Sequence, residues 1–174
     1  YCFVSNDPEH DIQLVKNVNR CDPKEYRTIV LYRCLMSDGL DEFIRKAKEG
    51  KIPVYFDIDD YVFDYQSIRH LDFLQGEEYK TFETYCNKIN ETIQRCNKLI
   101  TSTETLKKLL TQAFPSKQTL LNRNSASAAM YTLSRRAVSL TKKDPDRIVL
   151  GYFSGSKTHD KDFSVAVPAI LKVM

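Results

Sequence analysis

Four aspartates stand at the end of one apolar stretch, in the segment IPVYFDIDDYVFDY that covers residues 52–65. They are Asp57, Asp59, Asp60 and Asp64. Carboxylates this close repel one another and shift one another's pKa, so the group needs a cation, a hydrogen-bonding ligand or helix N-termini nearby. Because the residues before them read as a buried strand, the acids are expected on the rim of a sheet, where open α/β sheets bind ligands.

Several interpretations of this acidic cluster are open. In the plainest, one or two of the acids only cap backbone amides of the next segment. A haloacid-dehalogenase-type phosphatase would use Asp57 and Asp59, whose spacing matches the D-x-D-x-T/V nucleophile motif. Against it, Tyr61 stands where that motif has Thr or Val, and no G-D-x-x-x-D pair follows. A metal-dependent transferase of nucleotide sugars would use the D-x-D to hold a divalent cation through oxygen ligands.

A second stretch with candidate chemistry is GYFSGSKTHDKDF, residues 151–163. It combines an expected strand, a glycine-containing turn, a lysine, a histidine and the start of a helix. Amides at a helix N-terminus bind diphosphate oxygens, and Lys157 would be the accompanying cation. In the plainer interpretation, Gly155 only serves the turn, and Asp160 or Asp162 caps the helix.

Hydrophobic periodicity predicts the elements that position these residues. Strands are expected at 28–34, 53–58, 98–103 and 117–121. Helices are expected at 40–49, at 78–96, and from the segment TSTE (101–104) to Pro115. Strand, helix and strand with tight connections form βαβ units, which are parallel and right-handed in nearly all cases. The fold class is therefore α/β. The segment TSTE has the form of a capping box, which makes Thr101 the expected cap of the third helix.

The composition is that of a globular protein and argues against nucleic acid, a membrane span and zinc. Of 174 residues, 42% are hydrophobic, and the net charge of +3 is too small to indicate nucleic-acid binding. No apolar run approaches the roughly 20 residues of a membrane span, and the first residues lack a signal-peptide pattern. The five cysteines have no CxxC spacing and the three histidines are scattered, so reduced thiols are expected and zinc is not. Cys86 and Cys96 fall on an apolar helical stripe and are expected to act as small hydrophobes.

The character of the sequence changes after residue 122. Apolar residues thin out over 123–146, which is expected to be a linker or crossover. A new strand, loop and helix are expected from 147 to 174, as the start of a second domain. Both ends look cut, so we expect the sequence to be part of a longer protein.

Three segments together resemble bacterial glycosyltransferases of the GT-B architecture, which has two Rossmann-like domains. They are VYFDIDDYVFD, CNKLITST with its capped helix, and IVLGYFSGSKTHDKDF. More narrowly, the resemblance is to family 4-like enzymes that build O-antigen, capsule and other surface polysaccharides, and it covers roughly residues 28–174. It implies that residues 1–122 are the later part of an acceptor-side domain, a Rossmann-like parallel sheet with flanking helices. Residues 147–174 would begin the donor-side domain.

The resemblance also implies an activity, the transfer of a sugar from a nucleotide-sugar donor to a glycan or lipid-linked acceptor. Asp59 and Asp60 stand where related enzymes often have a His-Asp pair, so one of them would act as base or positioning group for the acceptor hydroxyl. This chain has no His at that place. The loop that touches the donor diphosphate in such enzymes corresponds to Ser154, Gly155, Ser156, Lys157, Thr158 and His159. The usual Arg of that loop is absent, which leaves Lys157 to supply the charge.

The same resemblance implies which cofactors the protein needs and where in the cell it acts. No metal and no cofactor are required in this architecture. The acidic E-x7-E-type motif of the donor pocket lies downstream in such enzymes, so these residues alone are expected to be inactive. A cytoplasmic enzyme, with peripheral association at the inner face of the plasma membrane and no nucleic-acid partner, is implied. The alternative from a different class is a non-catalytic α/β module that binds a nucleotide or a protein.

Overall fold

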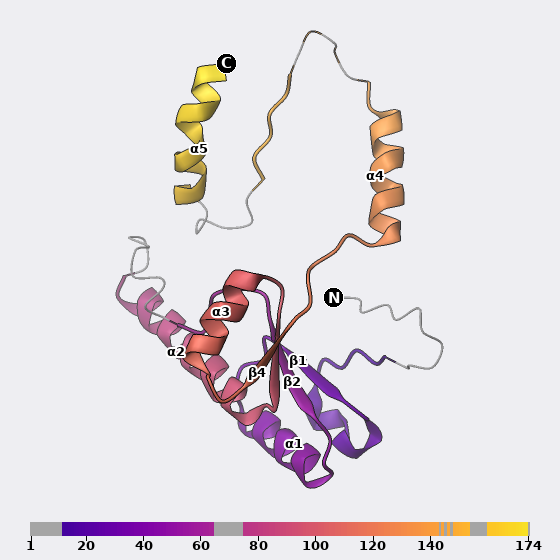
Figure 1. Cartoon of the computed structure of the whole chain (residues 1–174), viewed down its shortest axis with the longest axis vertical. Helices are drawn as coiled ribbons and strands as arrows, with labels where there is room; N and C mark the ends of the chain where they lie inside the picture. Colours follow the sequence, from indigo (N-terminus) through magenta and orange to yellow (C-terminus); the bar gives the residue numbers. More distant parts are fainter. Residues whose placement is uncertain are drawn as a thin grey trace. The chain divides into compact units, whose positions relative to one another are not determined.

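The computed structural model describes residues 12–64, 75–142, 144, 146, 148–153 and 160–173. The chain divides into two compact units, Tyr1–Asn124 and Ser125–Met174, and each is described by itself. Figure 1 shows the elements of both units in their order along the chain.

The first unit is built on a four-stranded parallel sheet. Its strands are β1 (Ile29–Tyr32), β2 (Val54–Ile58), β3 (Lys98–Thr101) and β4 (Gln118–Leu121), and they lie in the order β1-β2-β3-β4. In register, Leu31 lies beside Phe56 and Phe56 beside Leu99. These findings confirm the α/β class, the Rossmann-like parallel sheet and the central position of the strand that carries the acids.

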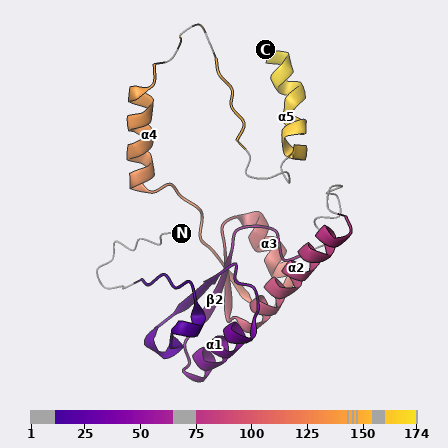
Figure 2. The ribbon, with the colours of Figure 1, turned by 180° about the vertical axis from the view of Figure 1, so that it is seen from behind.

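Three helices connect these strands: α1 (Asp38–Glu49), α2 (Glu77–Arg95) and α3 (Glu104–Ala113). When sequential parallel strands are joined by right-handed crossovers, all the connecting helices fall on one face of the sheet. Apolar residues of the three helices accordingly form one buried cluster with the side chains of that face, and Figure 2 shows the layer from behind. Two short 3-10 turns, η1 (Val18–Arg20) and η2 (Pro23–Glu25), precede β1 and contact α1.

Helix α1 forms where the sequence predicts it. The Ser37 side chain accepts a hydrogen bond from the Leu40 backbone N–H and caps the helix, and the helix ends at Gly50. The residues of its apolar stripe are buried: Leu40, Phe43, Ile44 and Ala47. This spacing of three and four residues turns one side of the helix toward the sheet.

The start of α3 corrects the expected capping box. The cap is Thr103, whose hydroxyl accepts from the Leu106 backbone N–H at 3.1 Å, and Glu104 is the first helical residue. Thr101 cannot serve as the cap, because it is the last residue of β3 and lies in register with Ile58 and Leu121. The helix therefore begins two residues later than the motif implies, because β3 keeps Thr101 extended.

The cysteines that the structure describes are free thiols. Cys86 and Cys96 are buried, whereas Cys21 and Cys34 are half-buried, and Cys2 lies outside the described residues. Burial raises the pKa of Cys86 to about 11, with a further contribution from the charge of Asp64. Burial also raises the pKa of Cys96 to about 12. For Cys86 and Cys96 the expected role of small core residues is confirmed.

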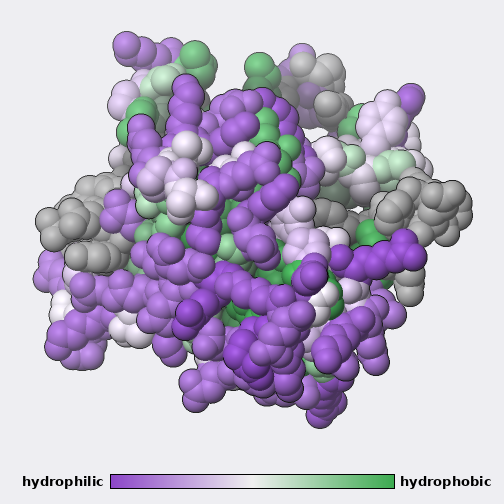
Figure 3. Space-filling view, turned by 60° about the horizontal axis from the view of Figure 1, so that its bottom comes forward, coloured by the Kyte–Doolittle hydropathy of each residue, from purple (hydrophilic) through white to green (hydrophobic). Residues whose placement is uncertain are grey.

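The second face of the sheet is less covered than the first. Val30 is 45% exposed and Leu120 36% exposed on this face. Its other residues are half-buried or exposed: Tyr32, Tyr55, Asp57, Lys98, Ile100 and Gln118. We call these eight residues the open face. Figure 3 gives another view of the surface, in which hydrophilic side chains predominate and hydrophobic ones show in small areas.

The second unit contains helices α4 (Ala128–Leu140) and α5 (Asp160–Val173). Helix α5 matches the predicted final helix. Helix α4 lies in the segment expected as a linker, and the Ser127 side chain caps it by accepting from the Met130 backbone N–H. The prediction of a strand before the glycine-containing turn was wrong, since residues 148–153 are irregular. A strand needs a partner for its backbone groups, and the composition of a segment does not supply one.

Candidate functional site

The acidic cluster lies at the carboxyl end of β2, as predicted. Asp57 is the last residue but one of β2, and Asp59 and Asp60 follow the strand directly. Parallel pairing brings the carboxyl ends of β1 and β3 to the same edge of the sheet. Side chains that leave β1 at this edge are therefore within reach of the acids.

Tyr32, at the end of β1, holds Asp59. It lies in register with Asp57. Its phenol O–H donates a hydrogen bond to Asp59 Oδ1 at 2.9 Å, and the contact is partly buried. Asp57 lies on the open face with Tyr32, and the hydrogen bond from Tyr32 places Asp59 on the same side.

Arg33 holds the second acid. Its Nη1 lies 2.6 Å from Asp60 Oδ2 and 3.8 Å from Asp59 Oδ1. Burial opposes the charge of the guanidinium, but hydrogen bonds with Tyr32 and Tyr85 and the charge of Asp60 outweigh it, so the pKa of Arg33 is raised. The guanidinium therefore stays cationic and neutralises part of the acidic cluster.

The backbone of Arg33 is held in an uncommon conformation. Its φ of 45° lies in the left-handed region, which costs a non-glycine residue on the order of 1–3 kcal/mol. Its N–H nevertheless donates to the Asp57 carbonyl at 3.1 Å, which extends the β1–β2 pairing by one residue. The chain thus leaves β1 sharply, and the side chain turns toward the end of β2.

Asp57 differs from the other two acids in its surroundings. Its carboxyl is half-buried, and its recorded hydrogen bond within the described residues comes from the Ile58 backbone N–H. Burial, followed by the nearby charge of Asp59, raises the pKa of Asp57 to about 6. Ionisation of the Asp57 carboxyl is therefore unfavourable in the folded state.

The raised pKa of Asp57 makes a prediction for stability. The folded state binds this proton more tightly than the unfolded chain, so the carboxyl destabilises the fold as the pH rises from about 4 to about 6. Asp57→Asn is expected to raise the free energy of unfolding at pH 7 by about 1 to 1.5 kcal/mol. That figure takes roughly half of the 1.36 kcal/mol per pKa unit, because solvent screens the half-exposed group.

Urea denaturation of both proteins at pH 4 and pH 7 checks this prediction. The difference between variant and wild type is expected to be small at pH 4 and to appear by pH 7. A variant that is less stable than the wild type at pH 7 would contradict the assigned burial.

Asp64 takes part in a separate contact. The Tyr61 O–H donates to Asp64 Oδ2 at 3.2 Å, and the Tyr61 ring stacks edge-on against buried Phe63 with 5.0 Å between centroids. Burial raises the pKa of the Tyr61 phenol, and the Asp64 carboxylate raises it further. The Tyr61 O–H is thus one partner of the Asp64 carboxylate.

The second predicted site is the diphosphate-binding segment before α5. Ser154, Gly155, Ser156, Lys157, Thr158 and His159 lie outside the described residues. Helix α5 begins at Asp160, directly after these six residues. Their role in binding a diphosphate stays a prediction.

The residues that the structure describes include no group of three or more His, Cys, Asp or Glu side chains arranged to hold a metal ion. They also include no helix with the length and hydrophobicity that crossing a bilayer requires.

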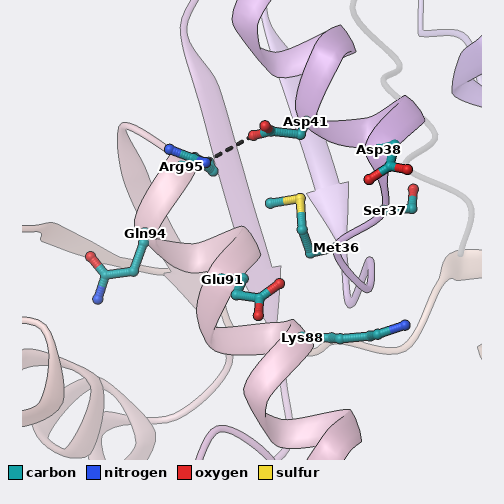
Figure 4. A pocket seen from close by; sticks show the side chains of 8 residues that line it. All are labelled: Met36, Ser37, Asp38, Asp41, Lys88, Glu91, Gln94 and Arg95. Atoms are coloured by element: carbon teal, nitrogen blue, oxygen red, sulfur yellow. Dashed lines mark ion pairs between the residues drawn. The ribbon is translucent and has the colours of Figure 1, made fainter.

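A groove of about 620 Å³ lies between α1 and α2 (Figure 4). Its lining residues are Met36, Ser37, Asp38, Asp41, Lys88, Glu91, Gln94 and Arg95. Arg95 Nε pairs with Asp41 Oδ1 at 2.8 Å across it, and the Met36 N–H donates to the Lys88 carbonyl. This groove contains none of the sequence-predicted acids. We therefore place the candidate site at the carboxyl end of β2, around Asp57, Asp59 and Asp60, and call it the acidic edge.

Tyr32 and Arg33 are the site residues that sequence reasoning missed. The signal was available: both end or follow the first predicted strand, and parallel pairing of that strand with the next one brings their side chains to the acids. Comparing the residues at the carboxyl ends of neighbouring predicted strands would have identified Tyr32 and Arg33.

Searches for known relatives gave no match. A scan against protein-family models, a search of curated proteins and a search of solved structures each found none.

Proposed function

We propose that the protein is a GT-B glycosyltransferase that moves a sugar from a nucleotide-sugar donor to a glycan or lipid-linked acceptor. The observation that carries the proposal is the pair Asp59 and Asp60, held at the carboxyl end of the central strand by Tyr32 and Arg33. Open α/β sheets bind ligands at this edge. A carboxylate within hydrogen-bond reach can orient or deprotonate a sugar hydroxyl.

The strand order gives no separate support for this placement. In a doubly wound sheet the ligand crevice opens where the order of strands reverses, and the order β1-β2-β3-β4 contains no reversal. The placement therefore rests on the contacts of Tyr32 and Arg33 with the acids at the carboxyl end of β2.

The donor side of the proposal rests on the loop before α5. We assign the donor diphosphate to residues 154–159, with Lys157 as its cation and the N-terminus of α5 as a source of free amides. Neutralising the leaving diphosphate is the electrostatic part of catalysis in such a transfer. For the location we propose the cytoplasm, with peripheral association at the inner face of the plasma membrane and no nucleic-acid partner.

A second candidate is a phosphatase that uses Asp57 as nucleophile and Asp59 as acid. The favouring observation is that the two carboxyls leave β2 on the same face, which such a pair requires. Tyr61, in place of the Thr or Val of the corresponding motif, speaks against it.

Calorimetry and turnover assays on the full-length protein separate the classes. The probes are UDP-, GDP- and dTDP-sugars, with release of nucleoside diphosphate as the signal, and p-nitrophenyl phosphate with release of phosphate. Sugar-nucleotide binding with nucleoside diphosphate release supports the transferase. Phosphate release from the monoester supports the phosphatase. Nucleotide binding without turnover of either probe would leave the non-catalytic binding module as the function.

A further inference from the structure

Helix α4 of the second unit (Figure 1) has a stripe of exposed apolar side chains. Leu133 is 64% exposed and Leu140 73% exposed, and three further residues share this exposure: Met130, Tyr131 and Val138. Their spacings of three, four and seven residues place them on one side of the helix. Single exposed apolar side chains are common on protein surfaces, but a continuous stripe of them marks a contact surface.

The opposite side of α4 is polar and basic. Its residues are Thr132, Arg135, Arg136 and Ser139. The guanidinium of Arg135 lies 5.8 Å from the centroid of the Tyr131 ring, one helical turn earlier, at the border between the two sides. Helices that lie in a membrane interface have this division, with apolar side chains on one side and Lys or Arg on the other.

The charge of the surrounding sequence is of one sign. Residues 105–143 contain eight Lys and Arg residues and no Asp or Glu, although the whole chain has 26 basic and 23 acidic residues. Basic segments are attracted to anionic lipids. A nucleic acid would match the charge of this segment but would leave the apolar stripe of α4 without a partner. Charge and stripe together therefore fit the surface of an anionic membrane.

The length of α4 limits how it can meet a bilayer. The helix has 13 residues, whereas a span requires roughly 20. We propose that α4 lies along the surface of a membrane that contains anionic lipids, with its apolar stripe among the acyl chains and Arg135 and Arg136 beside the lipid phosphates. This inference rests on the peripheral membrane association that is part of the proposed function, and it assigns the contact to one helix and one lipid charge.

The test measures binding of the full-length protein to vesicles by co-sedimentation. Vesicles of phosphatidylcholine are compared with vesicles in which about 30% of the lipid is the anionic phosphatidylglycerol. We expect binding to the anionic vesicles and weaker binding to the neutral ones. Affinity for the anionic vesicles is expected to fall as the salt concentration rises from about 0.1 M to about 0.5 M, because ions screen the attraction.

Two double variants assign the contact to α4. Arg135→Gln/Arg136→Gln is expected to weaken binding to the anionic vesicles by roughly 10- to 30-fold, since each basic side chain near the surface contributes about fivefold. Leu133→Gln/Leu140→Gln is expected to weaken binding to both kinds of vesicle by about tenfold or more. Both leucines are exposed, so these substitutions are expected to leave the fold intact, which circular dichroism checks.

Lys107→Gln/Lys108→Gln is the matched control. It also removes two neighbouring positive charges, but from helix α3, whose apolar residues Leu106 and Leu110 are buried. Its affinity is expected to stay close to that of the wild type. Equal losses in the control and the arginine variant overturn the role of α4, and so does a wild type that binds neither kind of vesicle. In the latter case, a wild-type dimer that dissociates in the leucine variant would assign the stripe to a second copy of the chain.

Turnover is measured on the same proteins without vesicles, as release of nucleoside diphosphate from UDP-, GDP- and dTDP-sugars. The α4 variants are expected to keep the wild-type rate. Turnover by a wild type that does not bind vesicles overturns the membrane role and leaves the transferase function standing. Vesicle binding that depends on α4, in a wild type without turnover, supports the membrane role and overturns the transferase function.

Discussion

Phe56→Ala is expected to lower the free energy of unfolding of the first unit by about 3–5 kcal/mol. Phe56 is fully buried in the central strand β2. In register it lies between Leu31 of β1 and Leu99 of β3, both of which are buried on the same face. Removing the ring takes away apolar burial and leaves a cavity that two flanking strands, held by backbone hydrogen bonds, cannot close.

Val30→Ala is the matched control for this experiment. Val30 is a strand residue on the open face and is 45% exposed, so its truncation is expected to cost less than about 1 kcal/mol. Urea denaturation of the three proteins gives the comparison. Equal losses in the two variants would mean that the face covered by the helices is not the core.

Lys157→Ala is expected to weaken nucleoside diphosphate binding by the full-length protein by about 1.5 to 3 kcal/mol, the range of a hydrogen bond to a charged group. This corresponds to roughly ten- to hundredfold in affinity. The reason is that Lys157 is the single cation in the predicted diphosphate loop, directly before α5. Calorimetric titration with UDP, GDP and dTDP measures the effect.

Lys161→Ala is the control, because Lys161 has the same charge and lies four residues further along the chain. Its affinity is expected to stay close to that of the wild type. If both variants bind the nucleoside diphosphates equally well, the assignment of the loop to the diphosphate fails, while the role of the acidic edge is unaffected.

The sheet and its helices could be predicted because an element that buries one face has apolar residues at a regular spacing in the sequence. In α1 the buried residues follow the helical spacing of three and four, and in β2 the buried residues Val54, Phe56 and Ile58 alternate with half-buried ones. Such periods depend on local geometry alone. They hold wherever one face of an element packs against the core.

The second unit was harder to predict for the same reason. The residues of α4 are all exposed, so no buried stripe marks the helix, and its polar stretches read as a linker. Residues 148–153 have the composition of a strand, but strand formation depends on a pairing partner that composition does not supply. The cap of α3 shifted from Thr101 to Thr103 because pairing with two neighbouring strands decided where β3 ends.

At the candidate site, the acids were predictable and their partners were not. The acids lie close together in the sequence and can be found by inspecting it: Asp57, Asp59 and Asp60. Tyr32 and Arg33 are separated from the acids in sequence by helix α1. Only the pairing of β1 with β2 brings them next to the acids. Spacing alone therefore does not show which acids are held in place and by which side chains.

The sequential strand order also has a consequence for how the first unit folds. Each strand pairs with the one that follows it in the chain, so the sheet contacts join segments separated by a single connection, a helix with its loops. A sequential order keeps these separations smaller than a crossed strand order would, which limits the entropy of loop closure. Each connection still spans a helix, so the parallel pairs are expected to form more slowly than the strand pairs of a hairpin.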